Sequence, residues 1–127
     1  MNANGLLKVC AGIFLAGFCF SSNVEAQADL AHKHFERGAM HHLNGNNDKA
    51  IAEFKKSLRY DKEHANTHFY LALVYEVKGN NFKALKHMLK AEKYFEMEGR
   101  EYWKERSRKR IEEYYVLFGY KREDFEK

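Results

Sequence analysis

The chain has 127 residues, of which 45% are hydrophobic and 31% are charged, and its net charge is +4. This balance is typical of a globular protein rather than a disordered one, and the length leaves room for one small domain. Proline is absent, which excludes a proline-rich linker, and the mild positive charge is too small by itself to indicate nucleic acid binding.

The first 26 residues have the order of a secretory signal sequence. A positive charge precedes an apolar run over residues 9–20, and small residues follow at two candidate cleavage sites. The run is shorter than the ~20 residues needed to span a bilayer comfortably. We therefore expect residues 1–26 to be a cleaved signal peptide, with the mature chain beginning at Gln27 or Asp29 and located in the periplasm or outside the cell. A buried helix or an uncleaved anchor is the alternative.

The sequence contains no recognisable catalytic pattern. Both cysteines, Cys10 and Cys19, lie in the expected signal peptide, so the mature chain would have no thiol nucleophile or thiolate ligand. Glycine-rich phosphate loops, nucleophile elbows and zinc-protease motifs do not occur. We therefore expect a protein that is not an enzyme and that has no cofactor.

Residues 31–64 and 65–98 are two copies of one 34-residue unit, with ten identical positions when they are aligned without a gap. Apolar residues recur at helical spacing on both sides of a Gly-Asn-Asn turn, so each copy predicts two helices. The expected helices cover residues 30–43, 48–60, 64–78, 82–95 and 100–118. The charged tail over 119–127 is expected to fray.

A helix–turn–helix period of 34 residues resembles the tetratricopeptide repeat family. The positions that carry the resemblance are small residues at the helix–helix contact, the turn glycine and a small residue early in the second helix. They are Gly38, Gly45 and Ala50 in the first copy and Ala72, Gly79 and Ala84 in the second. His34 and His68 replace the family's common tryptophan, and its proline after the second helix is missing. The resemblance implies an all-α protein: two repeats over 29–98 and a capping helix over 99–118, forming a right-handed superhelical solenoid. Together with the expected signal peptide, it describes an exported, bacterial-type protein that resembles this family.

In this family the first helix of each repeat lines a concave groove. The groove residues that the resemblance implies are His32, Phe35, His42, Asn66, Phe69, Leu73, Glu76, Arg100 and Trp103. Three aromatic rings among them, at 35, 69 and 103, recur at the repeat period and would anchor a partner segment; packing in the core is their alternative role. We therefore expect a protein-interaction module or assembly scaffold. A structural homo-oligomer built by end-to-end stacking is a second interpretation.

Two charged or titratable clusters have weaker functional interpretations. His64 and His68 are four residues apart, a spacing that can chelate zinc, but no third ligand is specified, so packed or solvated imidazoles are favoured. The basic run over 104–110 is interleaved with glutamates and predicts a solvated helix face rather than a nucleic acid site. Weak attraction to anionic lipid headgroups is its next interpretation.

Overall fold

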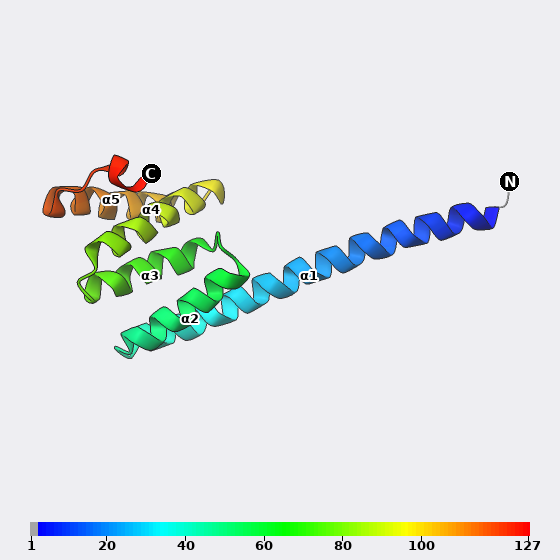
Figure 1. Cartoon of the computed structure of the whole chain (residues 1–127), viewed down its shortest axis with the longest axis horizontal. Helices are drawn as coiled ribbons and strands as arrows, with labels where there is room; N and C mark the ends of the chain where they lie inside the picture. The colour runs from blue at the N-terminus through cyan, green and yellow to red at the C-terminus, as the bar shows by residue number, and fades with distance from the viewer. Residues whose placement is uncertain (1–2) are drawn as a thin grey trace.

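The chain is all-α, as the sequence predicts. The computed structural model describes residues 22–127 in full and, for residues 3–21, only the backbone of a helix. The helices are α1 (Ala3–Leu43), α2 (Asn47–Tyr60), α3 (Ala65–Val77), α4 (Asn81–Met97) and α5 (Glu101–Phe118), followed by the 3-10 helix η1 (Arg122–Phe125). Figure 1 shows them stacked in chain order, from α1 and α2 at one end to α5 and η1 at the other.

The helix α1 begins well before residue 30, where the apolar pattern predicted its start. Side chains 22–30 are exposed, and Ala31 is the first of the described residues to be fully buried. The packed domain therefore starts where the sequence repeat starts. The expected signal peptide falls mostly on residues whose side chains are not described. Among the described residues, no helix combines the length and the apolar character that a membrane crossing requires.

The turns after α1 and α3 have the same backbone geometry. Gly45 and Gly79 have φ angles of 75° and 76°, in the left-handed region that glycine adopts without a steric penalty. In both turns the amide of the asparagine after the glycine donates back to a carbonyl near the end of the helix. These bonds run from Asn46 to His41 at 2.8 Å and from Asn80 to Tyr75 at 2.9 Å. These bonds satisfy carbonyl groups that the helix end would leave unpaired.

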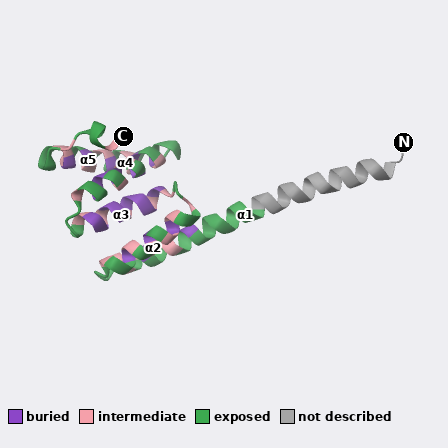
Figure 2. Cartoon of the chain, viewed as in Figure 1, coloured by how far each residue is buried: buried purple, intermediate pink, exposed green. Residues whose placement is uncertain are grey.

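The helices pack as two hairpins and one further helix. The first hairpin consists of α1, from Ala31 onward, and α2; the second consists of α3 and α4. Contacts between α2 and α3 and between α4 and α5 join these parts into a row. The central position of α3 explains why it is the most buried helix, as Figure 2 shows. Its side chains face neighbours on several sides, so its sequence lacks a polar stripe.

Small residues allow the helices of each hairpin to approach. Gly38 is buried, and a Cβ atom there would lie 2.6 Å from the Phe54 ring. The ring therefore occupies the space that any side chain at this position would need. At the corresponding positions of the second hairpin, Ala72 and Met88 are fully buried. The two hairpins thus fill equivalent places with different residue pairs.

The segment after α5 does not fray, contrary to the expectation from its charge. The Phe125 ring stacks on Phe82 of α4 with 4.7 Å between centroids, and Tyr120 lies 5.8 Å from Phe125. Arg122 pairs with Glu92 of α4 at 3.2 Å. Two aromatic residues and one ion pair hold the segment on α4, and the surrounding charged residues conceal this signal in the sequence.

Candidate functional site

The nine expected groove residues lie on α1, on α3 and at the beginning of α5. The structure brings several of their rings together: Phe69 and Trp103 meet edge to face at 5.5 Å. Phe35 contacts Tyr70 of α3 at 5.5 Å, and Tyr70 contacts Phe69 at 5.9 Å. A continuous row of rings therefore connects α1, α3 and α5. It includes Tyr70, which the repeat spacing did not indicate.

Phe69 is a core residue and not an exposed anchor. It is 5% exposed, and its ring packs against Phe95 of α4 as well as Trp103. The alternative role of this ring, packing between helices, is therefore the correct one, because α3 is covered by helices on several sides. Phe35 and Trp103 are half-buried and remain reachable from the surface.

A hollow of about 380 Å³ lies between α3 and α5. Phe69 and Leu73 of α3 form its apolar floor. The charged residues around it all come from α5: Arg106, Lys109, Arg110 and Glu113. Three cations and one carboxylate beside an apolar floor suit an acidic segment that also carries an apolar side chain.

Glu76 connects α3 to α5 instead of standing free in a groove. Its carboxylate accepts hydrogen bonds from Arg110 Nε at 3.2 Å and from the Tyr114 hydroxyl at 2.8 Å. Burial and the bond to Glu76 raise the pKa of Tyr114, so this hydroxyl remains a donor. Arg110 also pairs with Glu113 at 2.9 Å. Glu76 therefore joins α3 to α5 through Arg110 and Tyr114.

The basic run over 104–110 is mostly neutralised by carboxylates. The paired residues are Lys104, Arg108 and Arg110. Arg106 lies over the Trp103 ring at 5.5 Å, and Lys109 is exposed. Neither Arg106 nor Lys109 forms an ion pair with any described residue. Arg106 also donates a hydrogen bond to the Tyr102 hydroxyl at 3.2 Å. The charges of Arg106 and Lys109 are therefore not balanced by a carboxylate among the described residues.

The remaining expected groove residues do not line this hollow. His32 pairs with a glutamate one turn along α1 at 3.4 Å, and Arg100 lies over the Phe95 ring at 4.7 Å. Asn66 is half-buried at the beginning of α3. His42 lies near Tyr70, and its Nδ1 atom is buried without a hydrogen-bond partner among the described residues. The site is thus formed by α3 and α5, with smaller participation of α1 than the resemblance implied.

The histidines considered as zinc ligands make other contacts. His64 is the N-cap of α3, where its Nδ1 accepts a hydrogen bond from the Thr67 amide at 3.2 Å. It therefore precedes the helix and does not share a helix face with His68, as the four-residue spacing suggested. Burial lowers the pKa of His64. Among the described residues, no group of three or more potential metal ligands gathers.

His68 pairs instead with His87 of α4, with 3.0 Å between their Nδ1 atoms. His68 Nε2 lies 2.9 Å from the Lys62 carbonyl, so Nε2 carries the proton and donates it. His68 Nδ1 is then the acceptor and His87 Nδ1 the donor. Burial lowers the pKa of His68 to about 4 and that of His87 to about 3. Both rings are therefore neutral at pH 7.

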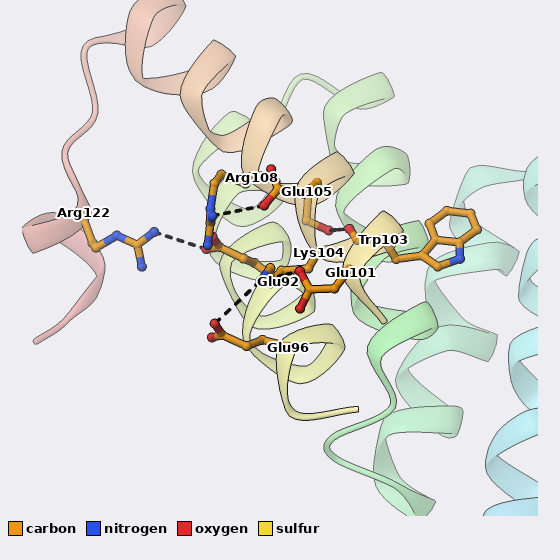
Figure 3. Close-up of polar contacts among 9 residues, drawn as sticks. Glu92, Glu96, Glu101, Trp103, Lys104, Glu105, Arg108 and Arg122 are labelled. Atoms are coloured by element: carbon orange, nitrogen blue, oxygen red, sulfur yellow. Dashed lines mark hydrogen bonds and ion pairs between the residues drawn. The ribbon is translucent and has the colours of Figure 1, made fainter. Parts of the chain in front are cut away.

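Glu92 is a buried polar residue that the sequence analysis missed. It is 6% exposed, and its carboxylate accepts hydrogen bonds from Arg108 at 2.9 Å and Arg122 at 3.2 Å. Figure 3 shows it between these two side chains, which come from α5 and the C-terminal segment. A signal was present, because Glu92 stands where the first copy has Leu58. An acidic residue at an apolar repeat position indicates a buried ion pair.

Comparisons with protein families, with curated proteins and with solved structures gave no significant match. Among the features of the chain, the α3–α5 hollow combines an apolar floor with unpaired charge. This combination is typical of a surface that binds another protein.

Proposed function

We propose that this chain is a non-catalytic protein-interaction module that holds an acidic segment of a partner protein in the α3–α5 hollow. The observation that carries the proposal is the floor of Phe69 and Leu73 next to Arg106 and Lys109, two cations without carboxylate partners among the described residues. An apolar anchor would contribute affinity on the floor, and the cations would favour acidic partners and speed their association.

The finer architecture is part of the same proposal: a tetratricopeptide-like, right-handed array in which α1, α3 and α5 line the concave side. Two contacts support it, because each joins residues 34 positions apart on successive helices of that side. They are the ring contact of Phe69 with Trp103 and the ion pair of Glu76 with Arg110. In this arrangement α5 is the cap that completes the second hairpin's packing.

Export is the third part of the proposal, and its support is the order of charges, apolar run and small residues over 1–26. The protein would then act in the periplasm or outside the cell. Intact-mass measurement of the protein from its host should give a chain beginning at Gln27 or Asp29. A mass that retains residues 1–26 would contradict export by cleavage.

Selection from a displayed peptide library against the purified protein tests the binding function. We expect enrichment of acidic segments that contain an aromatic or aliphatic residue. The double variant Arg106→Glu, Lys109→Glu should bind the selected peptide about tenfold or more weakly in fluorescence anisotropy. The matched control is Lys33→Glu, Arg37→Glu, which changes the net charge equally at exposed positions of α1 outside the hollow. Equal affinities of the two double variants would contradict the proposal.

Self-association is a second candidate, favoured by the apolar end of α5. Val116 and Leu117 are 85% and 72% exposed there, and Phe118 is 45% exposed. Such a cluster at the end of a helical row could pack against another copy. Light scattering would then give a mass above that of the monomer, and Leu117→Lys should return it to the monomer value. A monomer at all concentrations would reject this candidate.

A further inference from the structure

A second charged surface lies on α4 and the C-terminal segment. A hollow of about 340 Å³ there has Leu89 and Phe125 as its apolar residues. The charged residues around it are Lys86, Lys90, Lys93, Arg122 and Glu126. It shares no residue with the α3–α5 hollow, so the two surfaces can be occupied independently.

The lysines of this surface have no carboxylate partner among the described residues, unlike most of the cations of α5, although the Lys93 ammonium lies over the Tyr94 ring at 5.6 Å. Lys86, Lys90 and Lys93 are spaced by four and three residues, so they project from one face of α4. All three are exposed, and none forms an ion pair with a described residue. Arg122, by contrast, is held by Glu92 at 3.2 Å. The three lysines therefore keep their full charge for an external ligand.

The positive potential extends beyond α4. After burial, the groups that lower the pKa of His87 are all cationic or titrate to cations, and they include Lys90, Lys86 and Lys55 of α2. Cations from α4 and α2 therefore both act on this histidine.

Aromatic side chains border the lysines. Phe82 is 46% exposed, and Tyr120 and Phe125 are half-buried against it. Lysines on flexible stems next to half-exposed aromatic rings are the composition of surfaces that lie at the level of lipid headgroups. Lysine also presents a point charge without the fixed fork of arginine, which suits diffuse negative charge better than a single oriented carboxylate.

We propose that the face of α4 formed by Lys86, Lys90 and Lys93, with Phe82 and Phe125 beside it, docks on a membrane surface rich in anionic phospholipid headgroups. Docking in this way leaves the α3–α5 hollow open, so a bound partner would be held at the membrane surface. The inference does not depend on what binds in that hollow. It also differs from the sequence expectation, which assigned lipid attraction to the basic run of α5.

Vesicle co-sedimentation of the full chain tests this proposal. We expect binding to vesicles of phosphatidylcholine containing phosphatidylglycerol, weaker binding at raised salt, and little binding to pure phosphatidylcholine. The triple variant Lys86→Gln, Lys90→Gln, Lys93→Gln should lose about fivefold in partitioning for each lysine removed. The matched control is Lys33→Gln, Arg37→Gln, Lys49→Gln, three exposed cations without ion pairs to described residues, which should change partitioning much less.

Three results would overturn the proposal: no binding of the parent protein to the anionic vesicles, equal losses in the triple variant and its control, or tighter binding to an oligonucleotide in solution than to vesicles. The last result would assign the lysine face to nucleic acid. The variant Arg106→Glu, Lys109→Glu changes only residues of the α3–α5 hollow and should still bind vesicles. Vesicle binding and peptide binding are therefore measured separately, and one proposal can fail without the other.

Discussion

The two hairpins carry the same repeat but place different partners beside the same histidine. In the first, His34 Nδ1 lies 2.6 Å from Glu53 Oε2, and the ring stacks on Tyr60. The corresponding residues of the second, 34 positions further on, are His68, His87 and Tyr94: the two histidines are hydrogen-bonded, and the His68 ring lies tilted against Tyr94 with 5.4 Å between centroids. A carboxylate in one copy is thus an imidazole in the other, and this changes how each hairpin responds to protons.

A histidine that gains a proton beside a carboxylate keeps that contact as an ion pair. Two buried histidines lose the hydrogen bond between them when both gain a proton, because both rings are then donors and both are positive. The hydrogen bond from His34 holds the pKa of Glu53 below its usual range, with a smaller lowering effect from the hydrogen bond and charge of Lys56. The contribution of Glu53 to stability is present above its unfolded pKa and is lost only as the pH falls through the lower folded value. In the second hairpin His68 and His87 are neutral in the folded protein. Their contribution to stability is lost at a higher pH than the contribution of Glu53.

The largest difference between the hairpins should appear when the recurring phenylalanines are truncated. Phe69→Ala should lower the free energy of unfolding by about 3–5 kcal/mol, because it removes a ring from the core. Phe35→Ala should cost clearly less, because that ring is half-buried at the end of the row. Urea denaturation of both variants measures the difference. Equal losses of unfolding free energy in the two variants would mean that the central position of α3 does not determine how far the Phe69 ring is buried.

Exchanging the histidine partners should move acid sensitivity from one hairpin to the other. The pKa values of about 4 and 3 lie below the ordinary 6.5, so the unfolded chain binds protons that the folded chain does not. The contribution of these two histidines to stability is therefore fully present above pH 6.5 and falls as the pH is lowered, by up to about 1.4 kcal/mol per pH unit for each histidine.

His87→Glu, which copies the first hairpin, should reduce the fall in melting temperature between pH 7 and pH 5. The reciprocal change Glu53→His should increase it, because the first hairpin would then also contain a histidine pair. Thermal unfolding followed by circular dichroism at several pH values measures both. The same pH dependence in the parent and in both variants would refute this account.

The smallest effect is expected at Glu92, whose counterpart in the first hairpin is Leu58. Glu92→Leu should change the global free energy of unfolding by less than about 1 kcal/mol, because leucine fills the site and the two arginines can be solvated. Amide exchange over residues 120–126 should nevertheless accelerate, since Arg122 loses its partner. Glu105→Gln is the control, because it removes only the exposed partner of Arg108. Unchanged exchange in Glu92→Leu would show that the aromatic contacts alone hold the segment.

The sequence predicted helices where local patterns were sufficient. The ends of α2 and α5 agree with their predicted positions to within a residue, and the glycine turns lie where the Gly-Asn-Asn pattern placed them. The start of α1 and the ordered segment after α5 were missed. The start of α1 was missed because no helix-breaking residue marks a boundary just before residue 30. The segment after α5 was missed because its order depends on a contact between Phe82 and Phe125, which are distant in the sequence.

The candidate site was only partly predictable. The repeat spacing related Phe69 to Trp103, whose rings are in contact, but Arg106 and Lys109 were hidden in a basic run whose other cations are paired. Glu76 was expected to line the groove, and the sequence did not indicate that Arg110 and Tyr114 bind its carboxylate. Pairing of charges depends on which helix faces meet, and no local pattern contains that information.

By itself the sequence determined the period, the helical class and the turns, because glycine backbone preferences and helical spacing act over a few residues. The tertiary structure alone decided that Phe69 is buried while the identical Phe35 is half-exposed, and that His68 meets an imidazole while His34 meets a carboxylate. The physical reason is position in the row: a central helix is covered by neighbours on several sides, whereas a terminal helix is covered on fewer. Equal residues at equal repeat positions therefore acquire different burial and different partners.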